Sequence, residues 1–261
     1  MFIMVEKNYQ FLSEALSQLG FGDNLNDALK TKMKLGMPEF ELKASDEYGK
    51  DKVIYALKFG KKEDGEFYFL NAYHAKLTKE NGEVLEQNFP LFQQRGFTAD
   101  ETYNMLSGRA VYNSFRKDGE VISRWSRLDF NNQNDKGNFP IKSYYDNKSN
   151  FNLVKELSKL PLMANTQEDK EGLIRNLQKG NLEPVVVKQQ GNRERMFIEA
   201  TPQHQKITVY NTSMEKVNLV NNRMQVVQDE KQDAKLPEMT KTLMEKVNNP
   251  SQGEQPKKKV S

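Results

Sequence analysis

The sequence contains no cysteine and only two histidines among its 261 residues. The absence of cysteine excludes disulfide bonds, thiolate zinc sites, iron–sulfur clusters and cysteine nucleophiles. His74 lies in an alternating segment and His204 in a polar turn, and neither has a second imidazole beside it in the chain. We therefore expect a packed or surface histidine at each position, and we predict neither a metal nor a cofactor.

Long apolar segments are also missing. No apolar run approaches the roughly 18 to 20 residues that span a bilayer, and the start MFIMVEKNYQ has no basic segment before an apolar core. We expect a cytoplasmic protein that does not associate with membranes. The 39 basic and 36 acidic side chains leave a net charge of +3, which permits nucleic-acid association without arguing for it.

Motifs of common enzymes do not occur. A phosphate-binding loop needs several glycines close together, usually at the start of a helix. Gly108 and Gly180 instead stand alone after apolar helix ends, which is typical of C-caps, and Gly119 and Gly191 are typical of hairpin turns. The carboxylates lie in turn-rich segments without the framing of an acid/base pair. We predict a protein that is not an enzyme, and leave open a cryptic active site formed by distant residues.

The hydrophobic pattern predicts an α+β fold. Helical spacing from Val5 to Leu19, and again from Leu25 to Met33, predicts an N-terminal helical hairpin over residues 1–38. Period-two segments follow, and Thr98 with Glu101 forms a capping box ahead of a short helix that ends at Gly108. The sheets should be mainly antiparallel, because most strands are joined by short turns.

An internal repeat is the second feature of the chain. Gly65, Phe67 and Tyr73 recur 72 residues later, and Gly108 and Gly119 recur at the same offset. We predict two tandem units of β-hairpin, helix and β-hairpin that share a strand, over residues 39–130 and 125–226. Residues 227–261 are polar and rich in lysine, glutamine and asparagine, so we expect a mostly disordered tail.

One stretch combines aromatic and basic side chains. Between residues 109 and 127, aromatic residues alternate with arginines and a lysine, a composition with which single-strand binders stack on bases and contact phosphates. The alternative is that every second residue faces the core, with Trp125 buried and Arg124 solvated. The candidate nucleic-acid-binding residues are Arg109, Tyr112, Lys117, Arg124, Trp125 and Arg127.

Several strings together resemble one known family. LGFGDNLNDALKTKMKLGMPEFEL, FYFLNAYHAKL, ETYNMLSGRAVY, SRWSRLDF, LQKGN and MFIEATPQHQKITVYN occur in this order between about residues 12 and 220. In this combination the chain is similar to a family of unknown function from Bacteroidetes that is carried on conjugative and other mobile genetic elements. The resemblance implies a link to nucleic acid or to DNA-processing proteins, and it supplies no catalytic residues.

These observations predict a non-catalytic accessory protein of a mobile genetic element. It would bind nucleic acid, either DNA or RNA, or the DNA-processing machinery. The alternative is a protein-interaction adaptor or an inhibitor of a host system that uses an exposed sheet edge. The sequence leaves the oligomeric state open.

Overall fold

The computed structural model describes residues 2–61, 65–163, 166–189, 192–220 and 223–226. It confirms an α+β fold with helices at the N-terminus and antiparallel strands. The described residues form two compact units: the first contains residues up to Leu106 and residues 135–138, and the second contains residues 107–134 and 139–226. The predicted tail, residues 227–261, lies outside the described residues.

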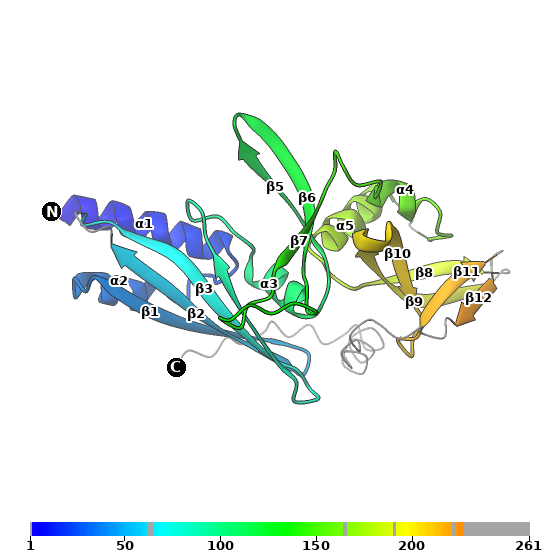
Figure 1. Ribbon diagram of the computed structural model, residues 1–261, viewed down its shortest axis with the longest axis horizontal. Coiled ribbons are helices and arrows are strands. Elements are labelled where there is room, and N and C mark those ends of the chain that lie inside the picture. The colour runs from blue at the N-terminus through cyan, green and yellow to red at the C-terminus, as the bar shows by residue number, and fades with distance from the viewer. Residues whose placement is uncertain (1, 62–64, 164–165, 190–191, 221–222, 227–261) are drawn as a thin grey trace. The chain divides into compact units, whose positions relative to one another are not determined.

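The first unit is an antiparallel sheet covered by helices on one face (Figure 1). The strand order follows the chain, β1-β2-β3-β4. Its elements are α1 (Phe2–Gln18), α2 (Asn26–Lys34), β1 (Glu39–Tyr48), β2 (Asp51–Lys61), β3 (Tyr68–Thr78), β4 (Val84–Pro90) and α3 (Ala99–Leu106).

Alternation along β2 explains the inner face of this sheet. Val53, Tyr55 and Leu57 are buried, whereas Lys52, which directly precedes Val53, is exposed. Phe21 follows α1 and places its ring edge-on against Tyr55, with the ring centroids 5.2 Å apart. The predicted helical hairpin therefore forms, and its apolar stripe covers the sheet.

Helix α3 begins as the sequence indicates. The backbone N–H of Thr98 donates to Glu101 Oε2 over 2.8 Å, and the N–H of Glu101 donates to Thr98 Oγ1 over 3.3 Å. Each side chain thus satisfies one helix-end amide of the other, which is the predicted capping box.

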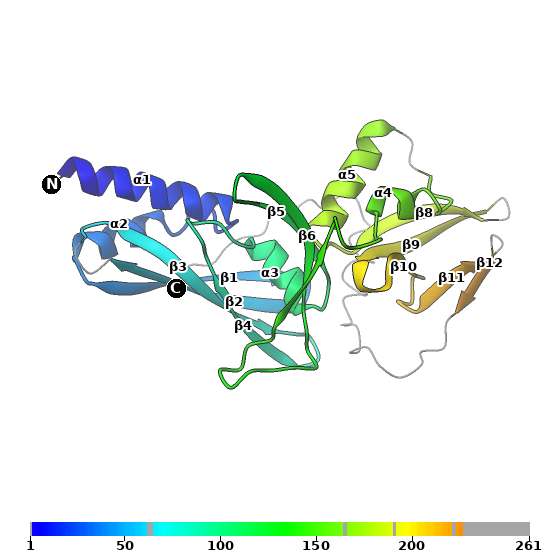
Figure 2. The same ribbon diagram turned by 45° about the horizontal axis from the view of Figure 1, so that its top comes forward.

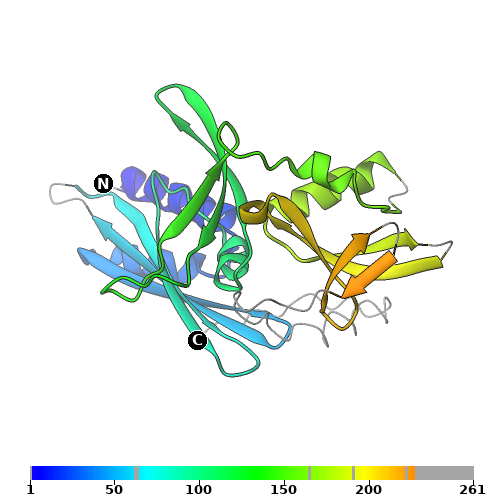
Figure 3. The same ribbon diagram turned by 45° about the vertical axis from the view of Figure 1, so that its right-hand side comes forward.

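The second unit contains two sheets and two short helices (Figures 2 and 3). One sheet has the order β5-β6-β7 and the other the order β12-β11-β10-β9-β8. The elements are β5 (Val111–Lys117), β6 (Glu120–Leu128), β7 (Ile141–Tyr145), α4 (Leu153–Leu157), α5 (Gln167–Gln178), β8 (Glu183–Gln189), β9 (Asn192–Thr201), the 3-10 helix η1 (Pro202–His204), β10 (Lys206–Tyr210), β11 (Lys216–Val220) and β12 (Arg223–Val226).

Helices α4 and α5 lie over the larger sheet, as Figure 3 shows. Leu177 of α5 and Leu153 of α4 join Val187, Ile198 and Val209 from the strands in one buried cluster. The same cluster includes Trp125 from β6, so the helices link the two sheets of this unit through apolar contacts.

The repeat is visible in the strand pairing of the second unit. In the β5–β6 hairpin Val111 pairs with Ser126, and in the β8–β9 hairpin Glu183 pairs with Ile198, each partner 72 residues later. Gly108 and Gly180, which follow α3 and α5, have φ angles of 88° and 82°. Helix, left-handed glycine and hairpin are therefore built twice in one register.

Other parts of the repeat differ. Lys52 to Lys61 of β2 pair with β3, but only Arg124 to Leu128 of β6 pair with β7. Tyr73 is fully buried, whereas Tyr145 is only half-buried, although the two occupy matching sequence positions. The boundary between the compact units falls at Leu106, inside the first predicted repeat, because its last hairpin shares a core with the second.

Candidate nucleic-acid interface

Strands β5 and β6 carry all but one of the predicted binding residues. Successive side chains in a strand point to opposite faces of the sheet, and Tyr112 pairs directly with Trp125. Tyr112, Trp125 and Arg127 therefore lie on one face, and Lys117 and Arg124 on the other. The structure divides the predicted residues between two faces.

On the second face, Arg124 lies between two aromatic rings. Its guanidinium carbon is 4.8 Å from the ring centroid of Phe115 and 5.8 Å from that of Tyr145. Its Nη1 donates a hydrogen bond to the Tyr145 hydroxyl over 3.3 Å. All three side chains are half-buried. We name these residues the Arg124 cluster; contacts between a cation and a ring at such partly exposed sites contribute about 0.5–1 kcal/mol each.

The cluster is also electropositive. The hydrogen bond from Arg124 and its positive charge lower the pKa of the Tyr145 hydroxyl from its ordinary value. The Nε of Arg124 has no hydrogen-bond partner among the described residues. This donor is buried, so the protein leaves it unused and a ligand does not reach it in this conformation.

Lys117 extends this face at the end of the hairpin. It pairs with Glu120 across a two-residue turn, in which Asp118 and Gly119 have φ angles of 52° and 85°. Two positive φ angles are those of the turn whose twist matches a hairpin, and Asp-Gly is a favoured sequence for it. Lys117 is exposed and lies on the same face of the sheet as Phe115 and Arg124.

Trp125 corrects the sequence-based prediction of base stacking. Its side chain is 3% exposed, and its ring centroid lies 5.2 Å from that of Tyr112 and 5.4 Å from that of Phe151. A ring enclosed by other rings cannot stack on a base, so the alternative of a core tryptophan is confirmed. Tyr112 packs against the same core and donates its hydroxyl to Asp146 Oδ2, and burial raises its pKa.

Arg109 is a second correction. It is 4% exposed, and its Nε donates to the carbonyl oxygen of Gly180 over 2.9 Å. The positive charges of Arg109 and Arg127 favour the charged form of Glu199. The carboxylate of Glu199 accepts a hydrogen bond from the Tyr210 hydroxyl over 2.6 Å. Burial raises the pKa of Glu199, and the two arginines oppose that increase. Arg109 therefore serves the interior of the second unit and not a phosphate.

Phe115 belongs to the basic and aromatic stretch of residues 109–127 but is not among the predicted binding residues, and neither is Tyr145. Phe115 is separated from Lys117 by one residue, so strand alternation alone places both on one face. Tyr145 lies on β7, and its pairing with Arg124 depends on the register of a strand 21 residues further along. Local alternation could have indicated the first residue, but only the fold shows the second.

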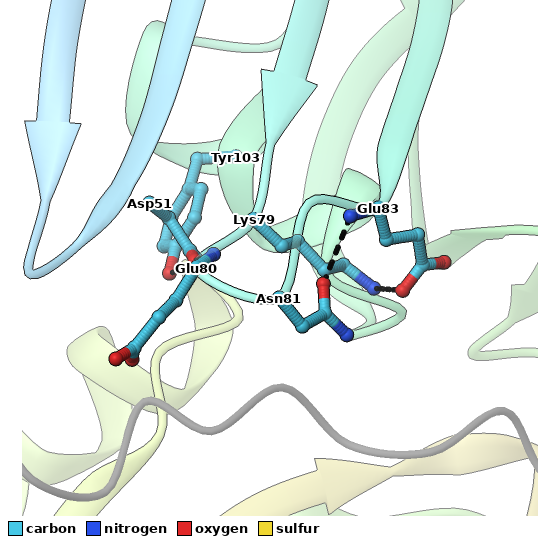
Figure 4. Close-up of polar contacts among 6 residues, drawn as sticks. All are labelled: Asp51, Lys79, Glu80, Asn81, Glu83 and Tyr103. Carbon is cyan, nitrogen blue, oxygen red and sulfur yellow. Dashed lines mark hydrogen bonds and ion pairs between the residues drawn. The ribbon is translucent and has the colours of Figure 1, made fainter.

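The first unit has a separate polar cluster, drawn in Figure 4. Asp51 is 3% exposed; its Oδ1 accepts the N–H of Glu80 over 2.9 Å, and its Oδ2 accepts the Tyr103 hydroxyl over 3.1 Å. Lys79 forms an ion pair with Glu83 over 2.9 Å in the same turn. Asp51 thus ties β2 to the β3–β4 turn and to α3, a structural role rather than a chemical one.

The described residues include no group of three or more histidine, aspartate or glutamate side chains that could hold a metal ion. His74 contacts Glu86, with 3.2 Å between Nε2 and Oε2. None of the described helices is long and apolar enough to cross a membrane. Comparisons with protein-family models, curated proteins and solved structures found no match to this chain.

Proposed function

We propose that this protein is a non-catalytic accessory protein of a mobile genetic element that binds single-stranded nucleic acid through the Arg124 cluster. The observation that carries the binding role is the position of the Arg124 guanidinium between the rings of Phe115 and Tyr145, on a half-exposed face of the β5–β6–β7 sheet. The link to mobile elements rests on the family resemblance of the sequence.

The arrangement suits unpaired bases. Every base has a flat π-face, and stacking on an aromatic side chain contributes about 1–3 kcal/mol per base with little sequence preference. Phe115 offers such a ring, and Arg124 holds it beside a fixed positive charge. Lys117, exposed at the end of the same face, can contact the phosphate of a neighbouring nucleotide.

Binding of labelled single-stranded DNA, duplex DNA and RNA by the full chain at two salt concentrations tests this proposal. We expect single strands to bind best, and added salt to weaken binding as counterions return to the phosphates. Phe115→Ala should cost about 1–3 kcal/mol of binding free energy. Lys117→Ala should reduce the slope of log affinity against log salt concentration by about 1, as expected for the loss of one phosphate contact.

The repeat supplies a matched control. Lys188 of β8 is exposed and occupies the position in the second hairpin that Arg116 occupies in the first. Lys188→Ala removes one positive charge from a comparable site away from the Arg124 cluster, and should leave binding unchanged. Equal losses for Lys188→Ala and Lys117→Ala would show a diffuse effect of net charge, and would contradict the proposed face.

A second candidate function is a protein-interaction adaptor or inhibitor, with a DNA-processing protein among its possible partners. The observation that favours it is the outer edge of β5, which among the described strands pairs with β6 alone and carries the exposed residues Ser114 and Arg116. An exposed strand edge with unpaired backbone groups is a feature of strand-addition sites. Binding to a protein partner that changes little with salt would favour this function over the first.

A further inference from the structure

The two matching hairpins differ at their outer edges. In the second hairpin, Leu162 forms an antiparallel bridge with Val187 of β8. The N–H of Met163 donates to the carbonyl of Val186, and the N–H of Lys188 donates to the carbonyl of Pro161, each over 2.9 Å. Residues 161–163 therefore lie along β8 as a short added strand.

No segment among the described residues covers the same positions of β5. Val186, Val187 and Lys188 correspond to Ser114, Phe115 and Arg116, and β5 is an edge strand that, among the described strands, pairs only with β6. The residues 72 positions before 161–163 are 89–91, which end β4 and continue along β3 instead. The chain thus uses the equivalent segment elsewhere in the first repeat.

The free groups of β5 point outward. Lys117 and Glu120 close the two-residue turn as a hydrogen-bonded pair, so the next pair, Arg116 with Val121, is not hydrogen-bonded. The N–H of Arg116 and the carbonyl of Ser114 therefore face away from β6. Both residues are exposed, and the described part of the chain provides no backbone partner for these two groups.

We infer that the outer edge of β5, at residues 114–116, binds an extended segment of a partner protein by antiparallel strand addition. This inference rests on the second proposed function and specifies its surface. The bound segment places an apolar residue opposite Phe115 and an acidic residue opposite Arg116.

The second hairpin defines this chemistry. There, Leu162 lies opposite Val187 and packs with the apolar core, so its counterpart in the partner would contact Phe115 and the adjacent Ile122. The residue before it accepts a hydrogen bond from position 188, which is Arg116 in the first hairpin. A carboxylate at that place pairs with the exposed guanidinium, which favours an acidic side chain.

Short synthetic peptides provide the probe. The peptide SKLPLM has the sequence of residues 158–163, and its variant SKLDLM places aspartate where Pro161 stands. We expect SKLDLM to bind the full chain more tightly than SKLPLM in isothermal titration calorimetry. Methylation of the backbone nitrogen of the methionine in SKLDLM removes the N–H that would donate to the carbonyl of Ser114. This change should weaken the binding of the peptide by about tenfold.

Two proline variants separate the edges of the hairpin. Arg116→Pro removes an outward N–H from β5, and Val121→Pro removes the outward N–H of its cross-strand neighbour on β6. Neither N–H belongs to the β5–β6 ladder, so both variants should fold. We expect Arg116→Pro to weaken SKLDLM by about tenfold or more, and Val121→Pro to retain the wild-type affinity.

Several results would overturn the inference. Failure of SKLDLM to bind, equal binding by both proline variants, or no effect of amide methylation would each remove β5 as the docking edge. A dimer that Arg116→Pro dissociates would assign this edge to a second copy of the chain. Capture of a protein partner that both proline variants retain would preserve the adaptor function and reject this edge alone.

Discussion

The Nε of Arg109 donates a hydrogen bond to the carbonyl oxygen of Gly180, over 2.9 Å. The residue after the helix-ending glycine of the first repeat thus binds the helix-ending glycine of the second. Because Arg109 is 4% exposed, Arg109→Ala should lower the free energy of unfolding by about 2–3 kcal/mol in urea denaturation. Lys117→Ala, at an exposed site, should change it little. A stable Arg109→Ala variant that loses nucleic-acid binding would show instead that Arg109 belongs to the binding interface.

Trp125→Ala should destabilise the protein through the cavity that it leaves in the core. Deletion of a buried tryptophan ring costs about 3–5 kcal/mol, and Trp125 is 3% exposed. Trp125→Phe retains most of the apolar contacts and should cost less, while leaving oligonucleotide affinity unchanged. Thermal unfolding monitored by circular dichroism measures both variants. Loss of affinity in a folded Trp125→Phe variant would contradict the core assignment.

Glu199 should make stability depend on pH. Burial raises its pKa above 4.5, although Tyr210, Arg109, Lys216 and Arg127 favour the charged form. The native state then holds the proton more tightly than the unfolded chain, so the free energy of unfolding decreases as the pH rises from 4.5 through the native pKa.

Glu199→Gln removes this ionisation and keeps an oxygen that accepts from Tyr210. Its stability should decline less than that of the wild type over the same pH range, in urea unfolding at a series of pH values. Glu194→Gln on the same strand is the control. Parallel curves for Glu199→Gln and the wild type would show that burial does not govern this carboxyl.

Gly108→Ala should destabilise the protein through backbone conformation alone. Gly108 has a φ of 88°, and a Cβ there would meet only an atom of Phe130 at an ordinary 3.8 Å. A left-handed conformation costs a non-glycine residue about 1–2 kcal/mol. Gly180→Ala, with a φ of 82°, should behave alike.

Gly172→Ala is the contrasting substitution. Gly172 lies inside α5, and a Cβ there has ample room. Alanine is preferred to glycine in a helix by about 1 kcal/mol, so this variant should become more stable. Chemical denaturation measures the free energy of unfolding of the three variants. An equal decrease for Gly108→Ala, Gly180→Ala and Gly172→Ala would contradict the conformational explanation.

Asp51 and Tyr103 should be energetically coupled. Asp51→Ala removes the hydrogen bonds that Asp51 accepts from the Tyr103 hydroxyl and the Glu80 amide, which should cost about 1–3 kcal/mol. Tyr103→Phe in the Asp51→Ala background should cost less than in the wild type, because the lost partner is already absent. A double-mutant cycle measures this difference; strictly additive losses would show that the contact contributes nothing.

The elements of the fold could be predicted because each has a local cause. The stripe of Leu12 and Leu16, the alternation along β2 and the Thr98–Glu101 capping box depend on residues within a few positions of one another. The offset between the two repeats could also be predicted from the sequence, because glycines that require positive φ angles occur at matching positions in both.

The binding face could be predicted only in part. Alternation places Lys117 and Arg124 together, but which face of the hairpin is buried depends on Phe151 and Leu177, far along the chain. Arg109 lies just before β5, and its partner, Gly180, is set by the packing of the second repeat. Composition identified a basic and aromatic stretch, whereas tertiary contacts divided it between the interior and the surface.

The position of Trp125 also gives the second unit an optical signal of its own. It is the only tryptophan in the chain, and it lies in the core of the second unit beside Tyr112 and Phe151. Selective excitation of indole emission therefore reports on the second unit alone, whereas circular dichroism reports on both units. Emission and circular dichroism that change at different denaturant concentrations would show two units that unfold separately, and coincident changes would show one cooperative body.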